Sequence, residues 1–466
     1  MAIDNLSQEL IDTIIDHASI KRDDLLACSL SWRRFLPRSQ FHLFSYIRIT
    51  STKHTYLTST REMFERRPIL KTYIRFLKIC YLETTAVFWR PLYENNEFVQ
   101  LMRALCPNGQ FKLGLESYQI PIGRIGSFQE PVSWGSFAQV FWQPFIAPNV
   151  TSLDLNVPYD IPFPLEFLFQ CPKLITLSTN NIFPSPGAIT PPLDLPSHHL
   201  HLTSLTIDGY DTSMYRLARA LLDFGEPCFK NRKLLEFDQF RTLDSQLNSE
   251  EDFRAMDDII ARSTETLEFC KFRMEPKSRH FNVEDQESML EAIKSSKLHL
   301  TVKLPAFKRL GIHFPSGGSE DNPNKFLIAA ELVRAFTSNS KLSRLSLQIR
   351  LLYPEDSESW QWASYHHDWR PLDEALFDLG QIVRGRIVLE IFVVAMEGFQ
   401  YVSTGPGDWD AVKDHAWKLG CEVNLEGENF LRSNLPITST SEFVSCRYNL
   451  QFNIELSSLN HIQYPS

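Results

Sequence analysis

A short phrase recurs along most of the chain and limits the folds open to it. The phrase has an apolar residue, two variable positions, a leucine, one variable position and a second apolar residue, and it indicates a buried β-strand. Clear copies centre on Leu77, Leu153, Leu205, Leu310 and Leu345. Weaker copies centre on Leu177, Phe237, Leu267 and Leu389, and a degenerate copy contains Leu113 and Leu115.

Helix-like segments separate these strands. They cover residues 98–105, 164–169, 214–224, 253–262, 283–294, 325–336 and 372–383. Cys-Pro follows two of them, at Cys106-Pro107 and Cys171-Pro172, where proline stops the helix before the next strand. The pattern predicts an α/β fold whose units stack into a curved solenoid with a parallel sheet on one side. The alternative is a doubly wound sheet, but the sequence shows neither a phosphate-binding glycine loop nor a ligand crevice.

The first 45 residues follow a different pattern. A first helix face carries Leu10, Ile11, Ile14, Ile15 and Ala18, and Asn5 or Ser7 can cap that helix. A second helix begins at Asp23 or Asp24. Pro37 suits the first turn of a third helix, which carries Phe41, Leu43 and Phe44. About forty residues are too few for an independent core, so this part needs other structure to cover it.

The ordered segments 6–11, 23–30 and 36–39 resemble the F-box, and most closely that of fungal F-box proteins, in which Cys-Ser-Leu and Leu-Pro-Arg-Ser phrases recur. The resemblance implies a three-helix module that docks onto the Skp-type adaptor of a cullin-RING ubiquitin ligase. Carried over by position, the adaptor-binding residues are Leu6, Ile11, Ile14, Ile15, Leu25, Leu26, Cys28, Leu30 and Phe35. The irregular steps between strand phrases resemble the degenerate leucine-rich repeats that follow the F-box in this family. The alternative is that these helices are ordinary parts of a larger α-helical domain.

Three positions depart from the family pattern. Ser7 stands where a proline is usual, Ser31 where a valine is usual, and Phe35 where a tryptophan is usual. Phe35 keeps an aromatic ring in its place. An unpartnered buried hydroxyl at Ser31 would cost roughly 1–3 kcal/mol, which corresponds to ~10–100-fold weaker docking.

The predicted organisation has four parts: an F-box at 1–45, a polar linker at 46–68, a leucine-rich-repeat-like solenoid at 69–395, and a C-terminal repeat or cap at 396–466. The last part contains a Gly405-Pro406-Gly407 turn, a helix over 409–419 and an alternating apolar pattern over 443–456. Such a segment can cover the open end of a stack of repeats.

Composition favours an intracellular protein. The chain has 47 basic and 56 acidic residues, for a net charge of −9, and this argues against a dedicated nucleic-acid binder. The basic residues between Arg33 and Arg67 are expected on a solvated face. No pair among the eight cysteines has C-x-x-C spacing, so reduced thiols in a cytoplasmic or nuclear protein fit best. The N-terminus does not have a secretory pattern, and the apolar stretch 387–396 is too short to span a membrane.

No catalytic constellation is visible, so the chain is not predicted to be an enzyme. His198, His199 and His201 have no acid or cysteine placed as a companion ligand, and His366-His367-Asp368 has the same weakness. No metal site and no cofactor are therefore predicted. The acidic run 250–252 is expected at a solvated helix start.

Two aromatic-rich segments are candidates for recognition. The first, 353–371, holds Trp360, Trp362, Tyr365 and Trp369, which are the residue types that dominate protein interfaces. The alternative is that these rings fold back on the edge of the sheet. The second segment, 117–142, is expected to pack.

The predicted function is that of a substrate-receptor subunit of a Skp–cullin–F-box ubiquitin ligase. Its partners would be the Skp-type adaptor, the cullin and an unknown protein target. The repeats would hold the target near the charged E2, raising the effective concentration of target lysines without a catalytic residue. The alternative is a non-ligase repeat scaffold whose degenerate F-box does not dock.

Overall fold

The structure is a computed structural model of the 466-residue chain. It describes residues 6–18, 22–50, 54–81, 90–105, 110–117, 133–156, 162–180, 182–184, 200–208, 213–223, 235–274, 283–296, 304–316, 325–337, 342–353, 368–382, 387–397, 433, 435–436 and 444–452. The chain divides into two compact units. Unit 1 comprises Met1–Gly209 and Arg219–Glu236, and unit 2 comprises Tyr210–Ala218 and Phe237–Ser466.

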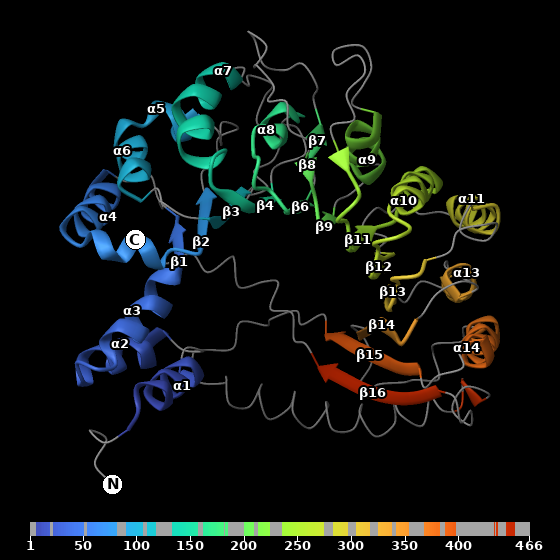
Figure 1. The fold of residues 1–466 in the computed structure, drawn as a ribbon. Coiled ribbons are helices and arrows are strands. Elements are labelled where there is room, and N and C mark those ends of the chain that lie inside the picture. Colours follow the sequence, from blue (N-terminus) through green and yellow to red (C-terminus); the bar gives the residue numbers. More distant parts are fainter. Residues whose placement is uncertain are drawn as a thin grey trace. The chain divides into compact units, whose positions relative to one another are not determined.

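Unit 1 contains parallel strands that follow one another in chain order. Its hydrogen-bonded order is β1 (Tyr46–Ile49), β2 (Phe76–Tyr81), β3 (Phe111–Ser117), β4 (Val150–Asn156), β6 (Thr176–Asn180) and β9 (Ser204–Asp208). Two short parallel pairs add β5 (Pro162–Phe163) with β7 (Phe183–Pro184), and β8 (Leu200–His201) with β10 (Leu235–Glu236). The predicted α/β class with a parallel sheet is confirmed (Figure 1).

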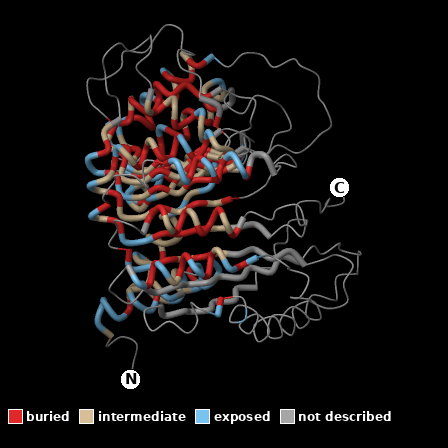
Figure 2. Tube along the Cα trace, turned by 90° about the vertical axis from the view of Figure 1, so that its right-hand side faces the viewer, coloured by how far each residue is buried: buried red, intermediate tan, exposed pale blue. Residues whose placement is uncertain are grey.

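One apolar row runs across these strands. Leu77, Leu113, Leu153, Leu177 and Leu205 are successive partners in register, and none is more than 1% exposed. The alternate residues of a strand face the other side and are more polar, so burial alternates along strands such as β4. Figure 2 shows buried and intermediate positions next to each other along the trace. The predicted strands around these leucines, the degenerate one included, are confirmed.

Helices connect the strands of unit 1. They are α1 (Gln8–Ala18), α2 (Arg22–Ser31), α3 (Leu36–Ser45), α4 (His54–Arg66), α5 (Arg90–Glu94), α6 (Asn96–Leu105), α7 (Trp134–Phe137) and α8 (Glu166–Phe169), with the 3-10 turn η2 (Pro68–Tyr73) and the π-helical segment η3 (Ala138–Ile146). Figure 1 shows α4, α6, α7 and α8 on the same side of the strands. Each buries an apolar face there, as α6 does with Phe98, Leu101, Met102 and Leu105.

Unit 2 repeats the arrangement. Its strands, in hydrogen-bonded order, are β11 (Thr242–Gln246), β12 (Phe269–Arg273), β13 (Arg309–Ser316), β14 (Arg344–Tyr353), β15 (Ile387–Glu397) and β16 (Val444–Phe452), all parallel. Its helices are α10 (Glu250–Arg262), α11 (Val283–Lys294), α13 (Lys325–Thr337) and α14 (Arg370–Ile382). Helix α9 (Ser213–Asp223) has residues in both units. The seven helices predicted between residues 98 and 383 are confirmed within three residues at their ends.

Two predicted strand centres in unit 2 are wrong. The row runs Leu243, Cys270, Leu310 and Leu345, where the sequence predicted Phe237 and Leu267 for the first two positions. Phe237 lies before β11, and Leu267 lies three residues before Cys270. In both observed strands the phrase is present, but Ser245 and Cys270 stand at positions where it normally has an apolar residue. The sequence pattern therefore did not reveal these two strands. Ser245 and Cys270 are both fully buried, because a small side chain fits under the helices as well as an aliphatic one does.

Residues 46–68 were predicted to be a polar linker, but they form strand β1 and helix α4. Ile49, Leu57 and Phe64 are each at most 2% exposed, so this segment contributes to the core of unit 1. Near the other end of the chain, β16 pairs with β15 in register, with Leu389 opposite Cys446. The predicted turn at 405–407 and helix at 409–419 lie outside the described residues.

An aromatic cluster fills unit 1 between β3 and β6. Trp134, Phe137, Phe141 and Trp142 from α7 and η3 pack with Phe163 and Phe167. The Trp142 indole Nε1 donates a hydrogen bond to the Phe167 carbonyl at 3.0 Å, and Trp142 is fully buried. The part of 117–142 that the structure describes from residue 133 onward therefore packs, as expected.

Asp252 in α10 is fully buried and was wrongly expected at a solvated helix start. Its carboxylate accepts backbone hydrogen bonds from Tyr215 (2.8 Å) and Asn248 (3.0 Å), which joins the start of α10 to α9. Burial raises the pKa of Asp252.

We expect Asp252→Ala to lower the free energy of unfolding by about 2 kcal/mol, because two backbone N–H groups lose their acceptor. Chemical denaturation followed by circular dichroism measures this. The exposed neighbour Glu251 provides the control, since Glu251→Ala should change stability by less than about 0.5 kcal/mol. Equal effects of the two substitutions would contradict the assignment.

Candidate functional site

The three N-terminal helices, α1 to α3, form a headpiece (residues 6–45) with a small core of its own. Ile11, Ile15 and Leu25 are buried, with Leu6, Trp32, Phe35 and Leu43 packed around them. The headpiece is also attached to the rest of unit 1. Phe44 contacts Phe64 of α4 edge to face, and the Ser45 carbonyl accepts a hydrogen bond from the Arg75 backbone at 2.9 Å.

The outer sides of α1 and α2 are apolar and exposed. Leu10 and Ile14, one turn apart on α1, are 55% and 49% exposed. Leu26 and Leu30, one turn apart on α2, are 41% and 86% exposed. We call these four residues the apolar ridges. Single exposed leucines are common, but these form half of the large exposed hydrophobic side chains in the described parts of the chain.

The predicted adaptor-binding residues divide into three groups. Ile14, Leu26 and Leu30 are exposed; Leu6, Cys28 and Phe35 are half-buried; and Ile11, Ile15 and Leu25 are buried in the headpiece core. The last three hold the helices together and do not lie on a surface. Leu10 was not among the predicted residues, although its spacing of four from Ile14 indicated a shared face.

The two serines that depart from the family pattern are both hydrogen-bonded. The Ser31 hydroxyl is exposed and donates to the Cys28 carbonyl at 3.0 Å. Covering it would not leave an unpartnered donor, so the penalty estimated from sequence does not apply. Ser7 accepts a hydrogen bond from the Leu10 backbone N–H at 3.4 Å and caps α1, while the other candidate cap, Asn5, lies outside the described residues.

A charged cluster joins α1 to α3. Arg38 donates to both carboxylate oxygens of Asp16 at 2.6 and 2.8 Å, and His42 Nε2 lies 2.7 Å from the same group. Arg38 was expected on a solvated face, but it clamps two helices. Hydrogen bonds from Arg38, and then from His42, lower the pKa of Asp16 well below its ordinary value.

This lowered pKa gives a prediction for acidic pH. The unfolded-state pKa of Asp16 is about 4, so the clamp stabilises the headpiece above that pH and loses its contribution as pH falls further. Asp16 is 39% exposed, so solvent screening limits the contribution to about 1 kcal/mol. We expect Asp16→Asn to speed amide hydrogen exchange in α1 and α3 at neutral pH, and the difference from the wild type to shrink progressively as pH falls from about 4 toward the lowered pKa of the folded state. A difference that does not change with pH over this range would contradict this.

Of the four predicted target-binding residues, the structure describes only Trp369. Trp360, Trp362 and Tyr365 lie outside the described residues. Trp369 is 4% exposed, and its ring centroid lies 4.2 Å from that of Phe326 on α13. Trp369 therefore packs in the core of unit 2, and its proposed contact with a target is withdrawn.

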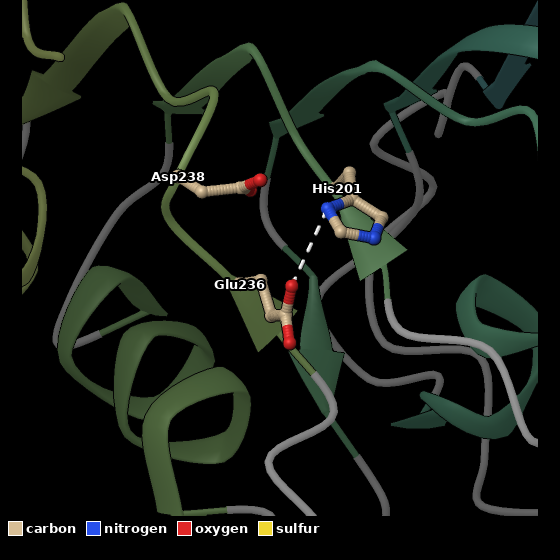
Figure 3. Close-up of side chains that lie close together, drawn as sticks. All are labelled: His201, Glu236 and Asp238. Atoms are coloured by element: carbon tan, nitrogen blue, oxygen red, sulfur yellow. Dashed lines mark ion pairs between the residues drawn. The ribbon is translucent and has the colours of Figure 1, made fainter.

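The histidine-rich segment contributes one side chain to the described structure. His201 on β8 lies opposite Glu236 on β10, with Nδ1 to Oε2 at 3.7 Å (Figure 3). Glu236 comes from a strand distant in the sequence, so no acid was expected beside these histidines. The ion pair links the two short strands β8 and β10.

Two cysteines, Cys171 and Cys270, are fully buried. Cys171 lies just after α8, and its thiol donates a hydrogen bond to the Phe167 carbonyl at 3.3 Å. Burial raises the pKa values of both Cys171 and Cys270. Raised thiol pKa values make these side chains poor nucleophiles. Among the described residues, no helix is long and apolar enough to cross a bilayer.

No family model matches this chain, and no curated protein or solved structure is significantly similar to it.

Proposed function

We propose that this chain is the substrate-receptor subunit of a Skp–cullin–F-box ubiquitin ligase. The headpiece is the F-box, and the units of strand and helix that follow are degenerate leucine-rich repeats. In this proposal the headpiece docks onto the adaptor, and the repeats hold a protein target.

The apolar ridges carry the proposal. Helices α1 and α2 bury Ile11, Ile15 and Leu25 in the headpiece core. The same two helices leave the apolar ridges, Leu10, Ile14, Leu26 and Leu30, exposed. Covering one such side chain contributes about 1–2 kcal/mol to the free energy of binding. A partner that covers all four would therefore gain several kcal/mol of binding free energy. The strand order supports the repeat assignment, since within each unit the strands pair in the order of the chain.

Reconstitution with purified adaptor tests the proposal. We expect the full chain and a Skp-type adaptor to form a complex that elutes together in size-exclusion chromatography, and affinity capture from cells to recover the adaptor and cullin. Deletion of 1–45 is a poor control, because it removes Phe44 and uncovers Phe64. A soluble chain that elutes separately from added adaptor would contradict the proposal.

The second candidate is a repeat scaffold that binds no adaptor. The burial of Ile11, Ile15 and Leu25 favours it, because these side chains already have partners within the chain. The same chromatography separates the candidates, since the scaffold elutes alone.

A further inference from the structure

The short strand pair β8 and β10 brings together side chains that are far apart in the sequence. His201 lies directly opposite Glu236 in this pair. The imidazole Nδ1 of His201 is 3.7 Å from Oε2 of Glu236, and each side chain is 40% exposed. The sequence predicted no metal site at the histidines because no companion ligand was visible near them. Strand pairing supplies that companion.

Asp238 completes a group of three side chains that metal ions commonly use as ligands. It follows Glu236 by two residues. One nitrogen or oxygen atom from each of His201, Glu236 and Asp238 lies within 4.8 Å of the other two. Figure 3 shows the polar atoms of the three side chains turned toward one another. We call these three residues the His-Glu-Asp group. Within the described ranges of the chain, no other three histidine, cysteine or acidic residues come together in this way.

The spacing of these atoms suits a single ion. Zinc binds histidine nitrogen and carboxylate oxygen at about 2.0–2.2 Å, so two ligands of one zinc ion lie about 3–4 Å apart. The distance between His201 and Glu236 is already in this range. The widest separation in the group, which is at most 4.8 Å, can close by side-chain rotation, since all three side chains reach solvent. Binding therefore requires no change in the strand pairing.

The ligand types distinguish between divalent cations. Imidazole nitrogen suits zinc and other transition metals, whereas calcium and magnesium prefer sites built from oxygen atoms alone. Two ionised carboxylates also balance the two positive charges of the ion. Three protein ligands leave a fourth position of tetrahedral zinc for water, and the exposure of the group gives water access to that position.

We propose that the His-Glu-Asp group binds a zinc ion. The ion joins β8 to β10 and so closes the long stretch of chain between them, where only two residues of each strand pair. The folded chain places the three ligands together and the unfolded chain does not, so zinc stabilises the folded state. This site goes beyond the proposed function, because it includes no residue of the headpiece and serves no step of adaptor docking.

Titration calorimetry of the full chain tests the proposal, after a chelator has removed metal and with the cysteines kept reduced. We expect zinc chloride to bind at one site with a dissociation constant in the micromolar range. His201→Ala should weaken binding by roughly 100-fold or more, since even loss of a partner of a metal ligand costs about 10–100-fold. Glu236→Gln should cause a similar loss. Calcium and magnesium chloride should bind at least roughly tenfold more weakly than zinc.

Hydrogen exchange followed by mass spectrometry gives a second measurement. Zinc should slow amide exchange in β8 and β10 of the wild type, because the ion holds the two strands together. It should have no such effect in His201→Ala. Circular dichroism of the metal-free proteins should be the same for the wild type, His201→Ala and Glu236→Gln, since both substituted side chains are partly exposed.

His17→Ala is the matched control. His17 is an exposed histidine on α1, so the substitution removes the same side chain from a different part of the surface. We expect this variant to bind zinc like the wild type. Unchanged zinc affinity in folded His201→Ala or Glu236→Gln, equal losses in His201→Ala and His17→Ala, or tighter binding of calcium than of zinc would overturn the proposal. No adaptor is present, so these outcomes leave the adaptor test of the proposed function unaffected.

Discussion

Ile14→Asp combined with Leu30→Asp is expected to abolish binding of a Skp-type adaptor. Both side chains are exposed in the isolated chain, so the substitutions leave the headpiece core of Ile11, Ile15 and Leu25 intact. In the complex each aspartate would lose about 1–2 kcal/mol of apolar burial and would also bring a charge into a covered interface. Together these costs predict a loss in affinity of roughly 1,000-fold or more, measured by titration calorimetry with purified adaptor.

Ile175→Asp provides the matched control. Ile175 is 45% exposed, close to the 49% of Ile14, and it lies in unit 1 away from the headpiece helices. This variant should bind the adaptor like the wild type. Leu25→Asp is unsuitable as a test, because Leu25 is 4% exposed and the charge would disrupt folding of the headpiece. Unchanged adaptor affinity in the folded double variant would refute docking through the ridges.

Trp142→Ala is expected to give the largest loss of stability in unit 1, about 3–5 kcal/mol. Trp142 is fully buried among Phe137, Phe163 and Phe167, so its removal leaves a cavity that these rings cannot fill without moving. It also leaves the Phe167 carbonyl without its indole donor. Chemical denaturation followed by circular dichroism measures the change in the free energy of unfolding.

Two further variants should lose less stability than Trp142→Ala. Trp142→Phe keeps most of the ring volume and removes the donor, so it should cost less, about 1–2 kcal/mol. Tyr56→Ala removes an aromatic that is 37% exposed on α4 and should cost less than about 1 kcal/mol. If Trp142→Ala is no more damaging than Tyr56→Ala, the aromatic cluster does not stabilise unit 1 as argued.

The strand phrase alone locates most of the sheet, and its failures have one cause. Where the buried positions are aliphatic, as around Leu153 and Leu345, the predicted centre and the observed register agree. Around Leu243 and Cys270 the buried row includes serine and cysteine, so the pattern shifted to the nearest leucine or phenylalanine. The linker predicted at 46–68 is a separate error, because Ile49, Leu57 and Phe64 are buried there.

The sequence by itself determined the α/β class, the parallel strands and the helices of the headpiece, because these depend on local periodicity and on capping residues such as Ser7 and Pro37. Only the tertiary structure decided which apolar residues of α1 and α2 are free. Ile11 and Ile14 belong to one helix face in sequence, yet packing against α3 buries the first and leaves the second exposed. It also placed Glu236 beside His201, since the partners of a strand are set by register across the sheet and not by distance along the chain.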